Sequence, residues 1–137
     1  MISKKTEELL SEIEKFSESK LKCINDIGIL IELSEINKSS ILFSDVIFTA
    51  KFICGLKSVL LKKTNTAEVQ KNLLKEYRTN LDIIIKKIKS ILETSDEGIK
   101  DMFEKKYFGN DEISLHNLID IIDELGICKN YYNSIRD

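Results

Sequence analysis

The stretch TAEVQKNLLKEYRTNLDIIIKKIKSIL, residues 66–92, decides the fold class of this chain. Apolar residues recur in it at steps of three and four, at Val69, Leu73, Tyr77, Leu81, Ile84, Ile85, Ile88 and Ile91. Basic residues recur between them with the same spacing, and a helix of about 3.6 residues per turn separates the two sets onto opposite faces. The stretch therefore predicts a long amphipathic helix that buries one side, with Thr66 or Thr64 as its N-cap.

The helical spacing continues on both sides of this stretch. We expect further helices over about residues 3–36, 41–63, 95–108 and 111–125, with Ser39 or Ser40 capping the second, Ser95 opening the fourth and Gly126 ending the last. Proline, which breaks helix interiors, does not occur in the 137 residues. The sequence thus predicts an all-α fold, a helical bundle of three long helices plus a shorter C-terminal helical pair, in a single domain over residues 1–137.

Residues 28–33 are the ambiguous part of this prediction. Their β-branched and leucine side chains fit a buried helix segment, but a short strand is the main alternative. A helix broken near Gly28 is a third interpretation. The first two helices also carry more apolar residues than one buried stripe needs, which favours burial against a partner helix.

Charge is unevenly distributed along the chain, although the formal net charge is only −2. Residues 37–64 hold five basic side chains and one acidic side chain, and residues 65–92 hold six and three, whereas both ends of the chain are acidic. In one interpretation the ends fold against the middle and the charges interleave. In the other, residues 37–92 present a lysine-rich face to nucleic acid, an anionic membrane or an acidic partner.

The candidate basic contact face lies on the long helix of residues 66–92. It consists of Lys71, Lys75, Arg78, Lys86, Lys87 and Lys89. Lysines attract phosphates without reading sequence, but arginine is scarce in this chain and few aromatic residues lie between the lysines. A solvated helix face is therefore the main interpretation, and nucleic-acid binding is possible but not favoured.

The sequence contains no pattern typical of an active site, and we expect no enzyme. His116 is the only histidine, on the expected polar side of its helix, and Cys23, Cys54 and Cys128 fall on expected apolar faces, where thiols are inert. The five glycines form no phosphate-binding loop. We therefore predict no cofactor and no metal site.

Residues 99–126, IKDMFEKKYFGNDEISLHNLIDIIDELG, look like the helix–loop–helix outline of a single EF-hand. In that alignment Ile113 takes the eighth position of the loop, Lys106 the first and Asn117 the twelfth. A calcium loop needs acidic oxygens at the first of these positions and a bidentate glutamate at the twelfth. We interpret the likeness as two neighbouring capped helices, with a hand that does not bind calcium as the alternative.

Three tyrosines near expected helix ends, Tyr107, Tyr131 and Tyr132, are candidate interface residues, since tyrosine is favoured at protein interfaces. We expect no transmembrane segment and no secretory signal, and reduced thiols in a cytoplasmic protein. The predicted function is that of a non-enzymatic helical-bundle protein that acts through protein–protein interaction or self-association, as an adaptor, scaffold or complex subunit. A nucleic-acid-associated subunit that uses the lysine-rich face of residues 37–92 is the alternative.

Overall fold

The structure, a computed structural model, describes residues 4, 7–8, 10–11, 23–36, 40–109 and 112–127. Its helices are α2 (Ile24–Ile36), α3 (Ser40–Leu60), α4 (Ala67–Leu92), α5 (Glu97–Tyr107) and α6 (Glu112–Ile127). The described residues include no strand. The predicted all-α fold is thus confirmed.

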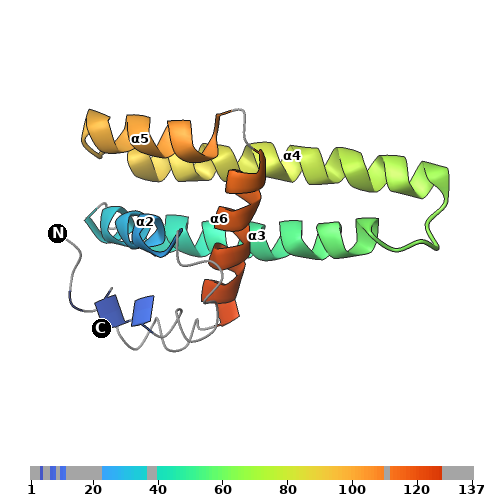
Figure 1. Cartoon of the computed structure of the whole chain (residues 1–137), viewed down its shortest axis with the longest axis horizontal. Helices are drawn as coiled ribbons and strands as arrows, with labels where there is room; N and C mark the ends of the chain where they lie inside the picture. The colour runs from blue at the N-terminus through green and yellow to red at the C-terminus, as the bar shows by residue number, and fades with distance from the viewer. Residues whose placement is uncertain are drawn as a thin grey trace.

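The centre of the molecule is the antiparallel pair of α3 and α4, which lie side by side along the longest dimension (Figure 1). The turn between them is held by the Asn65 side-chain amide, which donates a hydrogen bond to the Val59 carbonyl at 2.8 Å. Thr66 then caps α4, and its hydroxyl accepts a hydrogen bond from the amide of Val69 at 3.3 Å, as the sequence predicts. Both long helices therefore follow the sequence-based expectation closely.

The remaining helices cover only one half of this pair. Helix α2 packs near the start of α3, α5 lies along the C-terminal part of α4, and α6 crosses α3 at a steep angle (Figure 1). One hydrophobic cluster joins all five helices, and its largest fully buried side chains include Phe43, Phe103 and Tyr107. The buried residues of α4, in contrast, begin only at Ile84. The apolar stripe of α4 is therefore fully buried only in its C-terminal half.

The other half of the pair projects beyond the bundle. We call the segment from Gly55 to Asn80, which contains the end of α3, the turn and the first half of α4, the arm (Figure 1). Val69 is 45% exposed and Leu74 is 38% exposed in the arm, and Leu73 and Tyr77 are half-buried. A bundle covering the whole length of the long helices is not what the structure contains, because among the described helices only α6 reaches the arm, where its His116 stacks on Tyr77.

Helix α2 settles the ambiguous segment. It is continuous through Gly28, so the strand alternative and the break near Gly28 are both wrong. Its buried residues lie on more than one side of the helix, at Ile24, Asp26, Ile27, Gly28, Leu30, Ile31 and Ser34. Helix α2 begins only at Ile24, so the single helix expected over residues 3–36 is wrong. Residues 12–22 and the possible cap Ser39 lie outside the described residues.

Two helix ends differ from the sequence-based prediction. Asp96, rather than Ser95, caps α5, because its carboxylate accepts a hydrogen bond from the amide of Gly98 at 2.8 Å. Gly126 lies inside α6, which continues to Ile127, and is not a C-terminal cap. A Cβ atom at Gly126 would come within 2.7 Å of Cγ2 of Ile47, so glycine is required here by the close crossing of α6 over α3.

The EF-hand outline is not realised in the structure. Helix α5 ends at Tyr107 and α6 begins at Glu112, so most of the twelve residues from Lys106 to Asn117 are helical and do not form a loop. The likeness therefore reflects two helices joined by a short connection.

Candidate functional site

The predicted basic face is divided by the fold into exposed and internal parts. Lys71, Lys75 and Arg78 are exposed on the arm and line a cavity of about 460 Å³ along α4. Lys86 is also exposed. Lys87 instead points toward α3, where its ammonium group donates a hydrogen bond to the hydroxyl of buried Thr49 at 3.0 Å.

Lys89, the sixth predicted residue, lies over an aromatic ring. Its ammonium nitrogen is 5.8 Å from the centre of the Phe108 ring, a geometry that attracts the cation to the face of the ring. Lys87 and Lys89 therefore both contribute to contacts within the protein. The basic residues of the arm are the part of the predicted face that the structure brings together.

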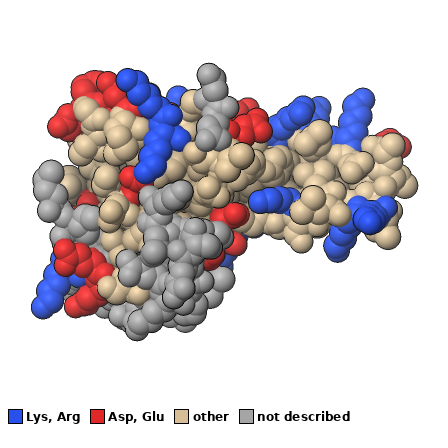
Figure 2. Space-filling model, viewed as in Figure 1, with Lys and Arg blue, Asp and Glu red and all other residues tan. Residues whose placement is uncertain are grey.

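The arm is basic, whereas the rest of the chain is acidic. Residues 55–80 contain six basic and two acidic side chains, although the whole chain has a net charge of −2. Figure 2 shows Lys and Arg side chains on both edges of the projecting part, and most of the visible Asp and Glu side chains on the bundle. The arm thus combines positive charge with the exposed apolar residues Val59, Leu61 and Val69.

Tyr107 is not available as an interface residue, because its side chain is only 2% exposed. Its hydroxyl donates a hydrogen bond to the carboxylate of buried Asp26 on α2, and the Lys106 ammonium group donates to the same oxygen at 2.7 Å. Burial, followed by the hydrogen bond to Asp26, raises the pKa of Tyr107. The interface prediction is wrong for Tyr107, and Tyr131 and Tyr132 lie outside the described residues.

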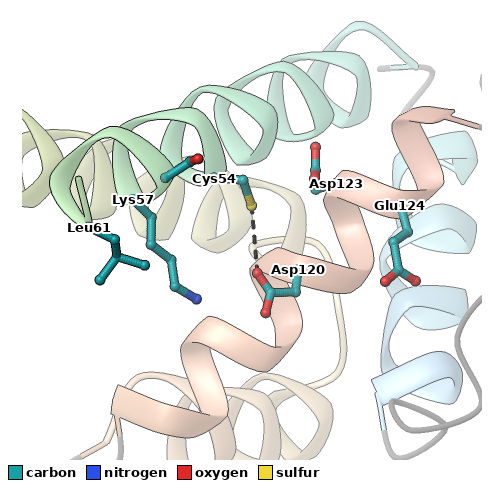
Figure 3. Close-up of a pocket in the computed structure, with 7 residues that line it drawn as sticks. Cys54, Lys57, Leu61, Asp120, Asp123 and Glu124 are labelled. Atoms are coloured by element: carbon teal, nitrogen blue, oxygen red, sulfur yellow. Dashed lines mark hydrogen bonds between the residues drawn. The ribbon is translucent and has the colours of Figure 1, made fainter. Parts of the chain in front are cut away.

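A cavity of about 310 Å³ lies beside Cys54, between α3 and α6 (Figure 3). Cys54 and Lys57 of α3 point toward Asp120 of α6, and the Cys54 thiol donates a long hydrogen bond of 3.6 Å to the Asp120 carboxylate. Glu124 points away from Cys54 toward α2 (Figure 3). Sequence reasoning places Cys54 on an apolar face, whereas the structure places it half-buried next to carboxylates.

This environment suppresses the reactivity of the Cys54 thiol. Burial, followed by the negative charges of Asp123 and Asp120, raises the pKa of Cys54 to about 12. Burial also raises the pKa of Asp123. A nucleophilic thiol needs a pKa lowered by a nearby base or cation, and His116 lines a different cavity. The Cys54 cavity is therefore poorly suited to thiol chemistry.

His116 is half-buried and paired with an aromatic side chain, contrary to the expected solvated position. Its Nδ1 atom lies 3.1 Å from the hydroxyl of Tyr77 on α4, and the two rings stack with centroids 5.9 Å apart. A cavity of about 380 Å³ adjoins them between α4, α5 and α6. Leu81, Ile85 and Leu115 contribute apolar surface to this cavity, and both acidic and basic side chains surround them.

The most unusual surface of the molecule lies on α3, on the side turned away from the core. Phe48, Phe52, Gly55 and Val59 follow one another at steps of four, three and four, which places them in one line along the helix. Phe48 is 72% exposed, Phe52 and Val59 are each 36% exposed, and Gly55 is exposed as well. We call these four residues the α3 stripe.

The α3 stripe is distinct from the surfaces by which α3 packs within the protein. Val46, Ala50 and Ile53 are completely or almost completely buried on the opposite side of the helix. The Thr49 side faces α4, through Lys87, and the Cys54 side faces α6, through Asp120. Apart from the adjoining backbone of α3 itself, no heavy atom of the described residues lies within 4 Å of the position that a Cβ of Gly55 would take. Two phenylalanines in an exposed line are therefore left without a neighbouring helix in the described part of the chain.

The sequence alone does not single out Phe48 and Phe52. The helical spacing of 48, 52, 55 and 59 is visible in the sequence, but α3 is apolar on several sides and the pattern alone does not tell which side meets α4 or α6. The usable signal is the excess of apolar residues in this helix, which predicts an additional contact without locating it.

Metal chemistry and membrane insertion find no support in the described residues. No group of three or more His, Cys, Asp or Glu side chains within the described ranges is arranged to hold a metal ion. None of the described helices is both long and apolar enough to cross a membrane. No protein-family model, curated protein or solved structure matches this chain.

Proposed function

We propose that this protein is a non-enzymatic binding module that acts through protein–protein interaction, with the α3 stripe as its contact surface. The observation that carries the proposal is the exposure of Phe48, at 72%, in line with Phe52 and Val59 on a helix whose other sides are packed. Aromatic side chains are costly to leave in water, and an apolar line on a helix is the usual means by which one helix binds another. A cytoplasmic location is part of the proposal, because Cys54 is not in a disulfide.

Site-specific photocrosslinking tests this function on the full chain. Benzoylphenylalanine replaces Phe48 in one variant and Leu61 in a control variant, and the protein is irradiated inside the cells that produce it. Leu61 is 76% exposed but lines the Cys54 cavity, on a different side of the chain from the stripe. We expect discrete crosslinked protein species from position 48 and none from position 61. Crosslinking that is absent at 48, or equal at both positions, would contradict the proposal.

The charge of the arm favours one second candidate, a nucleic-acid-associated subunit. Lys71, Lys75 and Arg78 line one surface of α4, and cations on such a surface bind phosphates with a strong dependence on salt. A labelled single-stranded and a labelled double-stranded oligonucleotide would be titrated at several salt concentrations. This function requires affinity that falls steeply with salt and is lost in Lys71→Glu with Lys75→Glu, and salt-independent or absent binding excludes it.

A further inference from the structure

The α3 stripe is complementary to a second copy of itself. When two α3 helices lie antiparallel about a two-fold axis between Phe52 and Gly55, Phe52 faces Gly55 of the second copy and Phe48 faces its Val59. The symmetry repeats each pair on the other side of the axis, so every residue of the stripe has a counterpart. The spacing of four, three and four is also that of a short helix–helix seam.

Side-chain sizes fit this register. The space around Gly55, where no described heavy atom outside the adjoining α3 backbone lies within 4 Å of the Cβ position, gives room for the ring of Phe52 from the other chain. Because glycine has no side chain, the two backbones approach closely at this point and the phenylalanines pack on each side of it. The pairing of a large residue with the smallest one is what close-packed interfaces require.

Charges fit the same register. Asp45 lies three residues before Phe48, and Lys62 lies three residues after Val59, so both extend the line of the stripe. Both residues are exposed. The chain continues as a helical turn beyond α3, since the amide of Lys62 donates a hydrogen bond to the carbonyl of Val59 at 3.1 Å. In the antiparallel arrangement each Asp45 faces Lys62 of the second copy, whereas a parallel arrangement sets like charges against each other.

We propose that two copies of this chain associate through their α3 stripes, antiparallel about a two-fold axis between Phe52 and Gly55. The inference rests on the proposed function, and it names the second copy as the partner. A single helix pair buries less surface than the roughly 1,200–2,000 Å² of standard stable interfaces. The dimer is therefore concentration-dependent, and single chains remain folded when it dissociates because the stripe is outside the core.

Charge reversal tests the register in the full-length protein. Sedimentation velocity over a range of concentrations gives the dimer dissociation constant for wild type, Asp45→Lys, Lys62→Asp and the double variant. We expect each single variant to weaken the dimer by about tenfold or more, because each turns two attractive contacts into repulsive ones. The double variant should return to within about threefold of wild type. An equimolar mixture of the two single variants should also associate, since positive side chains at both positions of one chain then face negative side chains of the other.

Asp101→Lys serves as the control, because it makes the same change of charge on an exposed position of α5. It should leave the dissociation constant unchanged. Gly55→Leu should abolish the dimer without loss of helical circular dichroism, because the added side chain has open space in the single chain. Single variants that bind like wild type, or a double variant as weak as both singles, would overturn the antiparallel register.

Sedimentation and photocrosslinking together distinguish a failure of the proposed dimer from a failure of the proposed binding function. If the purified protein stays a single chain at every concentration while position 48 crosslinks to a different protein in cells, the second copy is the wrong partner and the binding function stands. If position 48 crosslinks to nothing and the purified protein is a single chain, both are wrong.

Discussion

The Cys54 thiol shows how two neighbouring carboxylates and partial burial set the chemistry of a single residue. Its pKa of about 12, against an ordinary value of 9.0, leaves roughly a thousandfold less thiolate at pH 8. We expect iodoacetamide to alkylate Cys54 about a thousandfold more slowly in the native protein than in urea, as followed by mass spectrometry of the Cys54 peptide. The rate should keep rising with pH beyond pH 10.

The carboxylates give this prediction its control. Asp120→Asn with Asp123→Asn removes two of the causes of the raised pKa but leaves burial, so alkylation should accelerate only in part. The raised pKa also means that Cys54 favours the folded state below pH 9 and that this contribution is lost as pH rises toward 12. A native rate equal to the rate in urea would contradict the environment assigned to Cys54 and would reopen a role in thiol chemistry.

Asp26 is the second residue whose environment has a measurable consequence. It is 5% exposed and accepts hydrogen bonds from both Tyr107 and Lys106, which joins α2 to α5. Asp26→Ala leaves the buried Tyr107 hydroxyl without its acceptor, and we expect a loss of about 2–3 kcal/mol in the free energy of unfolding. Urea denaturation followed by circular dichroism measures this loss in the free energy of unfolding.

A double-mutant cycle separates the hydrogen bond from other effects. Tyr107→Phe alone should cost about 1 kcal/mol, because it removes the hydroxyl and leaves Asp26 paired with Lys106. In the Tyr107→Phe background, Asp26→Ala should cost clearly less than it does in wild type. Additive losses would mean that the Tyr107 hydroxyl and Asp26 do not interact.

At the scale of the helix, two glycines should respond in opposite ways to the same substitution. Gly126→Ala places a methyl group against Ile47 and Lys51, where α6 crosses α3, and should cost about 1–2 kcal/mol. Gly55→Ala adds a methyl group in open space inside α3 and should stabilise the single chain by about 0.5–1 kcal/mol. Thermal unfolding at low protein concentration compares the two, and equal effects would argue against the crossing of α6 over α3.

The arm predicts a gradient of stability along α4. Among the described helices, only α3 covers α4 before Tyr77, whereas Ile84, Ile88 and Ile91 in its second half are completely buried. Amides of residues 69–76 should therefore exchange with deuterium much faster than those of residues 84–92, because opening the arm exposes little apolar surface. Equal protection along α4 would contradict this gradient and would indicate that another surface covers the arm. A second chain bound to the arm at high protein concentration would give the same result.

For the molecule as a whole, sequence patterns predict the helices better than they predict how the helices pack. The bounds of α4 follow from Thr66 and the apolar spacing after it, because capping and periodicity depend on residues close in the chain. The burial of Tyr107 depends on Asp26, 81 residues away, and the position of Cys54 depends on Asp120 of a crossing helix. These contacts depend on the angles between helices, which the amphipathic pattern of each helix leaves undetermined.

The candidate surfaces also differ in how far the sequence predicts them, because one depends on a local pattern and the other on how the helices pack. The lysines of the arm are visible in the sequence, and the structure brings Lys71, Lys75 and Arg78 to one surface while Lys87 and Lys89 turn to internal contacts. The α3 stripe emerges only when α4 and α6 have taken their places on the other sides of α3. Its four residues become recognisable as a surface because the fold leaves them exposed.

Sedimentation equilibrium of the wild-type protein, recorded at 260 and 280 nm alongside Phe52→Glu, tests self-association through the α3 stripe most directly. We expect the wild-type mass to rise from one chain to two as concentration increases, with the absorbance ratio of pure protein. Phe52→Glu should stay a folded single chain, because the charge cannot be buried against Gly55 of a second copy. A wild-type protein that remains a single chain at every concentration, or a Phe52→Glu variant that dimerises equally well, would contradict this interface.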